Sequence, residues 1–262
     1  MRACSQRRGS GFNRASAENQ NRYVQWQNQQ RQQGAAAAQA QPPKRRNIVF
    51  ILSDDHRYDA LGFLKAQPWL RTPQLDRLAA EGAHFKNAFV TTALCSPSRA
   101  SILPGPSAHR HRIVDNNPPI PAGTVFFPSY LQKAGYKTGF FGKWHMGGGH
   151  KEVAPGFDRW VSFPGQGTYM DLALNVDGEE VPGNGYTTDV LTDYAVKFLE
   201  EHARAHQAQP FFLHLCYTAP HFPLHAKPAD IAKYRGKFTH GWDVERERRF
   251  AKQKELGLFA RD

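Results

Sequence analysis

The chain has few cysteines and no long apolar run. Its three cysteines, Cys4, Cys95 and Cys216, are scattered over 262 residues. Zinc knuckles and disulfide scaffolds need several cysteines at short spacings, so both classes are excluded. No apolar stretch approaches the roughly 20 residues that a membrane helix requires. We therefore expect no membrane association, and each cysteine must be judged by its own surroundings.

Acidic residues are scarce at the start of the chain. The first 46 residues contain nine Lys or Arg and one acid, Glu18, so most of the formal net charge of +11 lies there. This segment is rich in Gln, Asn, Arg and Ala and has too few apolar residues to form a core. We predict a disordered basic tail at 1–46 and a folded domain at 47–262.

The composition of the tail is weak evidence for any binding partner or cellular compartment. A basic segment rich in Gln and Ala, without aromatic residues interleaved along a basic stripe, is weak support for nucleic-acid binding. We therefore expect no nucleic-acid partner. The longest apolar stretch in the tail is four alanines at 35–38, which is too short for the core of a secretory signal. The compartment stays unknown.

Apolar strands alternate with helices after residue 46. Continuous apolar runs at 47–53 and 210–217 predict parallel strands that are buried on both faces. Further strands are expected at 84–90 and 137–141, and helices at 72–82, 126–134 and 188–206. The alternation predicts an α/β fold whose mostly parallel sheet is sandwiched by helices.

Polar clusters follow the ends of these strands, where ligands collect in α/β sheets. Asp54 and Asp55 follow the first strand, Lys143 and His145 a middle one, and His221 the last. Two adjacent carboxylates need a cation, basic side chains or water nearby, and a hard divalent ion such as Ca²⁺ fits them. The alternative is that one Asp caps a turn while the other faces solvent. Lys143 and His145 could equally be solvated loop residues.

The segment Cys-Ser-Pro-Ser-Arg at 95–99 places Cys95 at the start of a predicted helix. Free backbone N–H groups and the helix dipole favour anions there, and they also lower the pKa of a thiol in general. Arg99, one turn on, adds a forked donor suited to oxyanions. Taken alone, a Cys at this point could simply cap the helix.

The whole pentapeptide resembles the Cys-x-Pro-Ser-Arg motif of the type I sulfatases, which belong to the alkaline-phosphatase-like superfamily. Three more segments are similar to that family in the same order. They are Asn-Ile-Val-Phe-Ile-Leu-Ser-Asp-Asp at 47–55, Gly-Tyr-Lys-Thr and Gly-Lys-Trp-His at 135–145, and Ala-Pro-His at 219–221. The resemblance spans about 47–262 and identifies the N-terminal portion of a formylglycine-dependent sulfatase.

The resemblance implies a nucleophile and a metal. A formylglycine-generating enzyme would oxidise Cys95 to formylglycine, whose hydrate attacks the sulfur of a sulfate ester. Asp54, Asp55 and the modified Cys95 would hold a divalent metal, Ca²⁺. Substrates would be sulfated glycans or aryl sulfates. Family members are often periplasmic, secreted or lysosomal.

The resemblance also implies residues that handle the anion. Arg99 and Lys143 would steady the nucleophile and neutralise charge on the sulfuryl oxygens. His145 would orient or deprotonate the nucleophile. Lys143 and His221 would contact the sulfate group.

Two departures from the family pattern leave alternatives open. Pro104 stands where the family usually has Thr, so we expect the helix to end early. The family also completes its metal site with a later Asp-Asn or Asp-Gln pair. The chain ends at Asp262 before such a turn, which predicts a truncated domain with an open sheet edge. The alternatives are an inactive fragment, or a phosphodiester or phosphonate monoester hydrolase of the same fold.

Overall fold

The structure is a computed structural model that describes residues 21–22, 24–29, 45–147 and 152–259. The chain divides into two units, residues 1–45 and 46–262. In the first unit, residues 21–22 and 24–29 are helical. Most of the tail predicted to be disordered lies outside the described residues, so that expectation stays a prediction.

The second unit is built on one mixed sheet with the strand order β1-β6-β2-β3-β4-β5. Strands β1, β6, β2 and β3 run parallel, whereas β4 and β5 are antiparallel to their neighbours. The strands are β1 (Ile48–Leu52), β2 (Lys137–Lys143), β3 (Arg159–Phe163), β4 (Leu174–Val176), β5 (Glu179–Val181) and β6 (Phe211–Cys216). This confirms the mostly parallel sheet expected from the sequence.

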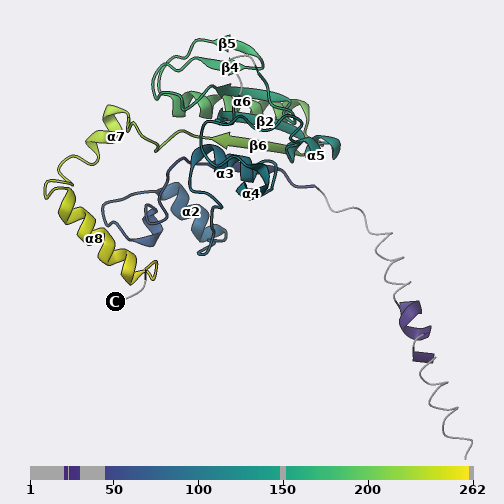
Figure 1. The fold of residues 1–262 in the computed structure, drawn as a ribbon, viewed down its shortest axis with the longest axis horizontal. Helices are drawn as coiled ribbons and strands as arrows, with labels where there is room; N and C mark the ends of the chain where they lie inside the picture. The colour runs from purple at the N-terminus through teal and green to yellow at the C-terminus, as the bar shows by residue number, and fades with distance from the viewer. Residues whose placement is uncertain (1–20, 23, 30–44, 148–151, 260–262) are drawn as a thin grey trace, which may run out of the picture. The chain divides into compact units, whose positions relative to one another are not determined.

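Helices cover both faces of this sheet (Figure 1). On one face, α3 (Cys95–Ile102) and α5 (Pro128–Lys133) pack on a cluster that includes Phe140, Trp160 and Phe212. On the other face, α6 (Thr187–Ala205) buries its apolar stripe against Phe141 and Leu213. Alternate residues of β2 and β6 therefore belong to opposite cores, as a two-sided sheet requires.

The predicted helices form where their local signals indicated. α2 spans Pro73–Glu81, with Pro at its first position and Gly82 after its end. α6 starts and ends one residue before the predicted bounds. Strand β3 and the remaining helices were not predicted; these helices are η1 (Gly62–Leu64), α4 (Ala108–His111), α7 (Pro228–Ala232) and α8 (Trp242–Glu255).

Strand β1 is parallel, as predicted, but it is not buried on both faces. It lies at the edge of the sheet, and Val49 and Ile51 are 51% and 57% exposed. These two side chains point to the face that α6 covers, but α6 packs on β2 and β6 and leaves β1 uncovered. The prediction that β1 is buried on both faces was wrong, because no described helix covers this face of the edge strand.

The strand predicted at 84–90 does not form. This segment has no regular structure, and Phe85 and Phe89 are 77% and 90% exposed. Apolar residues at alternate positions are not sufficient for a strand, because its backbone groups need a partner. The segment pairs with none of the described strands.

A hairpin missed by the sequence interpretation extends the other side of the sheet. β4 and β5 are joined by Asp177 and Gly178, both with positive φ, at 53° and 96°. Asp-Gly is a strong signal for a two-residue turn of this type. The Asn175 side chain accepts a hydrogen bond from the Gly178 N–H at 2.7 Å and stabilises the turn.

Among the described residues, no helix is both long enough and apolar enough to cross a bilayer.

Candidate active site

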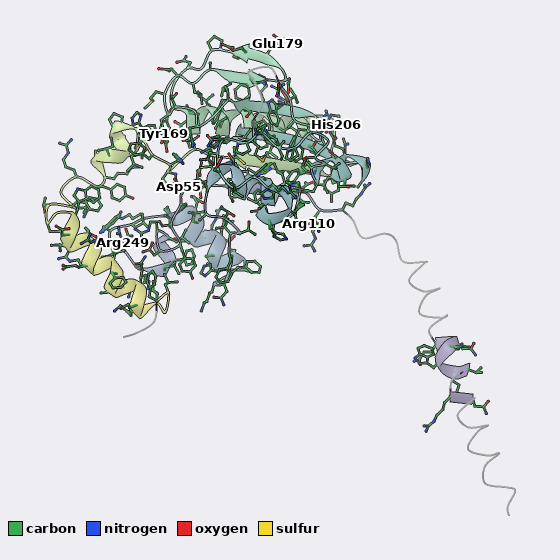
Figure 2. The ribbon with its side chains drawn as sticks, viewed as in Figure 1. Asp55, Arg110, Tyr169, Glu179, His206 and Arg249 are labelled. Atoms are coloured by element: carbon green, nitrogen blue, oxygen red, sulfur yellow. The ribbon has the colours of Figure 1, made fainter. Side chains whose placement is uncertain are left out.

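The site lies where three parallel strands end at the same edge of the sheet. The chain leaves β1 into Asp54, ends β2 at Lys143 and leaves β6 toward His221. A backbone hydrogen bond of 3.0 Å from the Asp54 N–H to the Ala219 carbonyl joins two of these loops. Asp55 marks this end of the sheet in Figure 2.

Helix α3 begins at Cys95, as the Cys-Ser-Pro segment predicts. Leu94 before it is extended, and the free N–H of Ser96 donates to the Asn116 side chain at 3.0 Å. The Ser96 hydroxyl donates to the His145 carbonyl, which fixes the helix start against the loop after β2. The helix ends at Ile102, before Leu103 and Pro104, so the expected early end is confirmed.

The Asp54 carboxylate is the centre of the cluster. Its Oδ2 accepts from Lys143 Nζ at 2.5 Å and from Arg99 Nη2 at 3.3 Å. Its Oδ1 faces the Cys95 sulfur at 3.7 Å. One carboxylate oxygen is thus held by two cations, while the other is directed to the thiol.

Lys143 is fully buried, at 0% exposure, and its charge is compensated inside the site. Besides Asp54, its Nζ donates to the Gln166 side-chain oxygen and lies 3.4 Å from the Cys95 sulfur. A buried ammonium is stable only with such partners, because removal from water costs several kcal/mol, on the order of the energy of the whole fold. Lys143 therefore carries a fixed positive charge beside the thiol.

Arg99 reaches the same centre from one turn further along α3. Its Nη1 donates to the Lys143 carbonyl at 2.5 Å, and its guanidinium is buried at 5% exposure. Its Nε has no hydrogen-bond partner among the described groups. Arg99 and Lys143 thus both bind the Asp54 carboxylate that faces Cys95, and the excess positive charge favours an anionic ligand.

His221 and Asp55 lie at the more open side. The ligand atoms of Asp54, Cys95 and His221 lie within 4.8 Å of one another. The His221 Nε2 is 3.6 Å from an Asp55 carboxylate that is 60% exposed. Asp55 has a φ of 59°, an uncommon conformation for a residue other than glycine that often marks functional sites.

His145 completes the set of predicted residues. Its backbone binds Ser96, and its Nδ1 is buried without a partner among the described groups. Burial, and then the positive charges of Lys143 and Arg99, lower the pKa of His145 to about 4. The imidazole is therefore neutral near pH 7 and can accept a proton.

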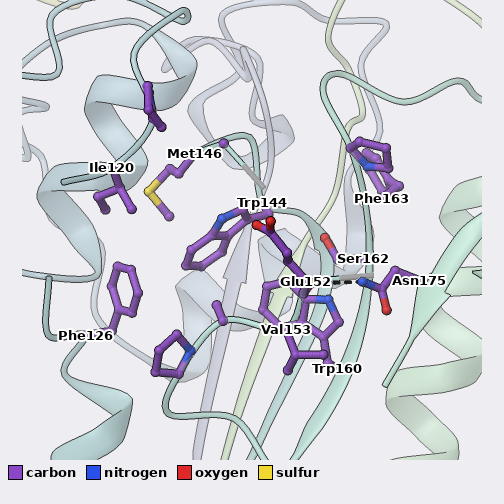
Figure 3. A pocket seen from close by; sticks show the side chains of 15 residues that line it. Ile120, Phe126, Trp144, Met146, Glu152, Val153, Trp160, Ser162, Phe163 and Asn175 are labelled. Atoms are coloured by element: carbon purple, nitrogen blue, oxygen red, sulfur yellow. Dashed lines mark hydrogen bonds between the residues drawn. The ribbon is translucent and has the colours of Figure 1, made fainter. Parts of the chain in front are cut away.

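A cavity of about 300 Å³ opens over Asp54, Cys95 and Arg99. A second pocket, of about 240 Å³, lies behind Trp144 and Trp160 (Figure 3). Its walls are mainly apolar, and the Asn175 amide that lines it is bound to the Glu152 carbonyl at 2.9 Å. None of the predicted site residues lines this second pocket, whereas Asp54, Asp55, Cys95 and Arg99 all line the first cavity.

Three residues of the site were missed by sequence reasoning. Gln166 binds Lys143, Asn116 caps the Ser96 N–H, and the Tyr169 hydroxyl donates to the His221 carbonyl at 2.8 Å. Burial, followed by its neighbour Tyr186, raises the pKa of Tyr169 to about 12, so the phenol keeps its proton. Gln166 lies in a Gly-Gln-Gly turn, a weak signal for an exposed functional loop. The other two carry no local signal.

Comparisons of the sequence with known proteins agree with the motifs. The Sulfatase family model matches residues 46–257. An N-acetylglucosamine-6-O-sulfatase of Bacteroides thetaiotaomicron is 34% identical over 239 residues, which cover 84% of this chain and 41% of the relative. A human N-acetylgalactosamine-6-sulfatase is 33% identical over 233 residues, covering 75% and 44%. The chain therefore spans about two fifths of the length of these curated relatives.

Solved structures give the same result. BT4656 in complex with its substrate D-glucosamine-2-N,6-O-disulfate is 35% identical, with a TM-score of 0.68 over 74% of this chain and 38% of that one. Ps i-CgsB in complex with k-i-k-neocarrahexaose is 31% identical, with a TM-score of 0.68 over 73% and 49%. Because the family model covers most of the chain and the fold agrees, the chain belongs to the sulfatase family.

Proposed function

We propose that the protein hydrolyses sulfate esters, with a formylglycine formed from Cys95 as the nucleophile. One observation carries the proposal. Cys95, Asp54 and Lys143 contact one another in a buried cluster beside an open cavity. A plain structural cysteine would not require two buried cations and a carboxylate around its sulfur.

The donor set suits a hard divalent cation, for which we propose Ca²⁺ held by Asp54, Asp55 and the modified residue 95. Asp54 Oδ2 is already bound by Lys143 and Arg99, so Oδ1 is the oxygen available to a metal. Replacement of the Cys95 thiol by oxygen would change a soft ligand into one that Ca²⁺ prefers. When bound, the ion would supply positive charge that favours an ionised hydroxyl at residue 95.

The remaining site residues have separate roles in binding and cleaving the sulfate group. Arg99, which lines the cavity, and Lys143, which is held 3.4 Å from the Cys95 sulfur, neutralise the sulfuryl oxygens, because both cations are fixed before any substrate binds. His145 orients the nucleophile or deprotonates it, and its pKa of about 4 keeps the ring neutral near pH 7. His221, on the open side of the cluster, contacts the sulfate together with Lys143.

For the substrate, we propose a hexosamine that carries a 6-O-sulfate, free or within a sulfated glycan. The two relatives named above are sulfatases of N-acetylglucosamine and N-acetylgalactosamine at that position. The same proposal requires one protein partner, a formylglycine-generating enzyme that converts Cys95.

The test is co-expression of the chain with a formylglycine-generating enzyme. We expect the peptide that contains Cys95 to lose about 18 Da in mass spectrometry, the change from thiol to aldehyde. The modified protein with Ca²⁺ should then release sulfate from N-acetylglucosamine-6-sulfate.

A matched control for the mass change is Cys216→Ala, which removes the other described cysteine and should leave the loss of about 18 Da at Cys95 unchanged. Cys95→Ala should abolish both the mass change and the release of sulfate. An unmodified Cys95 in the co-expressed protein would contradict the proposal. Faster hydrolysis of the corresponding phosphate ester would instead assign the site to phosphoryl transfer.

A further inference from the structure

A further histidine, His214, lies beside Arg99 and has no part in the mechanism proposed above. His214 is in the middle of β6, where it pairs in register with Phe50 of β1 and Phe140 of β2. It is 2% exposed, and its ring makes T-shaped contacts with both phenylalanines, at centroid distances of 4.8 and 5.3 Å. Its side chain points to the sheet face that α3 covers.

Three polar atoms are left without protein partners at this place. They are both ring nitrogens of His214 and the Nε of Arg99, each without a hydrogen bond among the described groups. A buried polar atom with no partner lowers the stability of the fold, because it has lost its hydrogen bonds to water. The donor Arg99 Nε and one acceptor nitrogen of the His214 ring can share a single additional partner at this place.

The space for that partner is present. A small void of about 10 Å³ lies between α3 and the sheet, and Arg99, His214 and Cys216 are among its lining residues. A water molecule needs roughly 10–15 Å³ of such space and two to four polar partners. The void therefore has room for one water and for nothing larger.

The groups that line the void supply one hydrogen-bond acceptor and one donor. Burial, and then the charge of Arg99, lower the pKa of His214 to about 3, so its ring offers one free lone pair near neutral pH. The Arg99 Nε–H is a permanent donor. Burial raises the pKa of Cys216 to about 11, so its thiol remains protonated, and its side chain is hydrogen-bonded to Arg99.

We propose that one buried water occupies this void, accepts a hydrogen bond from the Arg99 Nε–H and donates one to a ring nitrogen of His214. His214 is thereby a positioning residue for Arg99. Asp54 and the Lys143 carbonyl fix one end of the guanidinium, and the water fixes the Nε side. The effect on sulfate rests on the proposed function, whereas the water itself does not.

The water is tested without any activity measurement. A crystal structure of the chain that resolves ordered solvent should show one water within hydrogen-bonding distance of Arg99 Nε and a ring nitrogen of His214. In solution, the Arg99 Nε–H resonance should exchange slowly with solvent. A dry void, or a direct bond between the two side chains, would overturn the proposal even if the protein proved to be a sulfatase.

The positioning role is tested with two kinds of variant. His214→Phe keeps an aromatic ring but removes the acceptor, and we expect the Kd of inorganic sulfate, measured by calorimetry, to rise about threefold to tenfold. His214→Asn and His214→Gln retain an acceptor near Nδ1 or Nε2, and one of them should restore the wild-type Kd. Rapid exchange of the Arg99 Nε–H should accompany the weaker binding in the Phe variant.

The matched control is His202→Phe. His202 is also buried, at 6% exposure, with an Nδ1 that has no partner among the described groups, but it lies on α6 against the opposite sheet face. It should lose stability without any change in sulfate affinity. If His214→Phe and His202→Phe leave the Kd equally unchanged, the positioning role is wrong. If the wild-type protein binds no sulfate, the proposed function is wrong. Whether the water is present is then judged from the crystal structure and the exchange of the Arg99 Nε–H alone.

Discussion

The ammonium nitrogen of Lys143 lies 3.4 Å from the sulfur of Cys95 and bonds the Asp54 carboxylate at 2.5 Å. The Cys95 sulfur therefore has both a fixed cation and an anion as neighbours. Both charges are buried, so each depends on the other for its stability.

The first prediction concerns this buried pair. Lys143→Met should lower the free energy of unfolding by about 3 kcal/mol, because it leaves the Asp54 carboxylate with only Arg99 as a buried cationic partner. Adding Asp54→Asn should recover part of that loss. The double variant should therefore lose less free energy of unfolding than the two single variants lose together. Urea unfolding measures all three variants.

The surface pair of Lys227 and Asp189 serves as the comparison, because both side chains are largely exposed. Lys227→Met should leave the unfolding midpoint unchanged within error. Strict additivity of the Lys143 and Asp54 substitutions would contradict the predicted coupling.

The second prediction is a difference in reactivity between two cysteines. Cys95 borders the cavity of about 300 Å³, whereas Cys216 is 1% exposed and its pKa is raised to about 11 by burial. Iodoacetamide at pH 8 should therefore alkylate Cys95 in the native protein and spare Cys216. Peptide mass mapping measures the alkylation of each cysteine. In urea, both Cys95 and Cys216 should be alkylated.

The experiment uses a Cys4→Ser background, because Cys4 lies outside the described residues. Native alkylation of Cys216 at the rate of Cys95 would show that the two environments are not as different as the structure indicates.

The third prediction concerns the close approach of β2 and β6. Gly142 has a φ of 112°, and a Cβ at this position would lie 1.9 Å from the Cys216 carbonyl oxygen. Gly142→Ala should therefore separate the strands and destabilise the protein by more than about 3 kcal/mol, through steric overlap in addition to backbone strain.

Gly105→Ala is the matched control. Gly105 also has a positive φ, 90°, but a Cβ added there would meet no atom within 4 Å. This substitution should cost only the strain of about 1 kcal/mol. Thermal unfolding compares the two, and equal losses would exclude the steric explanation.

The fourth prediction is a pH dependence of stability. The pKa of His214 is lowered to about 3 in the folded protein, from an ordinary value of 6.5. Between these values the unfolded chain binds a proton that the folded chain does not, so stability falls as the pH decreases from 6.5 toward 3. The maximum slope for one group is about 1.4 kcal/mol per pH unit.

His214→Phe removes this contribution. We expect the wild type to lose more stability than the variant between pH 7 and pH 4.5, measured by urea unfolding at each pH. Parallel pH profiles would show that His214 accepts a proton in the folded state.

Much of the site follows from sequence because it depends on local rules. The apolar runs predicted parallel strands, and the ends of parallel strands meet at one edge, so Asp54, Lys143 and His221 were expected to be close. The Cys-Ser-Pro segment predicted a helix start at Cys95, and Pro104 predicted its early end. Each of these signals is contained in a few neighbouring residues.

The features that were missed depend on contacts between distant segments. The strand at 84–90 failed for lack of a partner, and β1 is exposed because α6 does not extend over it. The hydrogen bond between Gln166 and Lys143 joins residues 23 positions apart, and no sequence pattern in either segment predicts this pairing. The Asp-Gly turn of the β4–β5 hairpin is different, because its signal was present in the sequence and was overlooked.

The pairing of β1 with β6 has a consequence for the order of events during synthesis. Asn47 beside β1 accepts a hydrogen bond from the Phe211 N–H, 164 residues later in the chain. At ribosomal rates of roughly 5–20 residues per second, β1 waits on the order of ten seconds for its only described partner strand. Cys95 leaves the ribosome within that interval. The formylglycine-generating enzyme that we propose as a partner would therefore meet Cys95 in a chain that is still growing, whereas the residue is 7% exposed after folding.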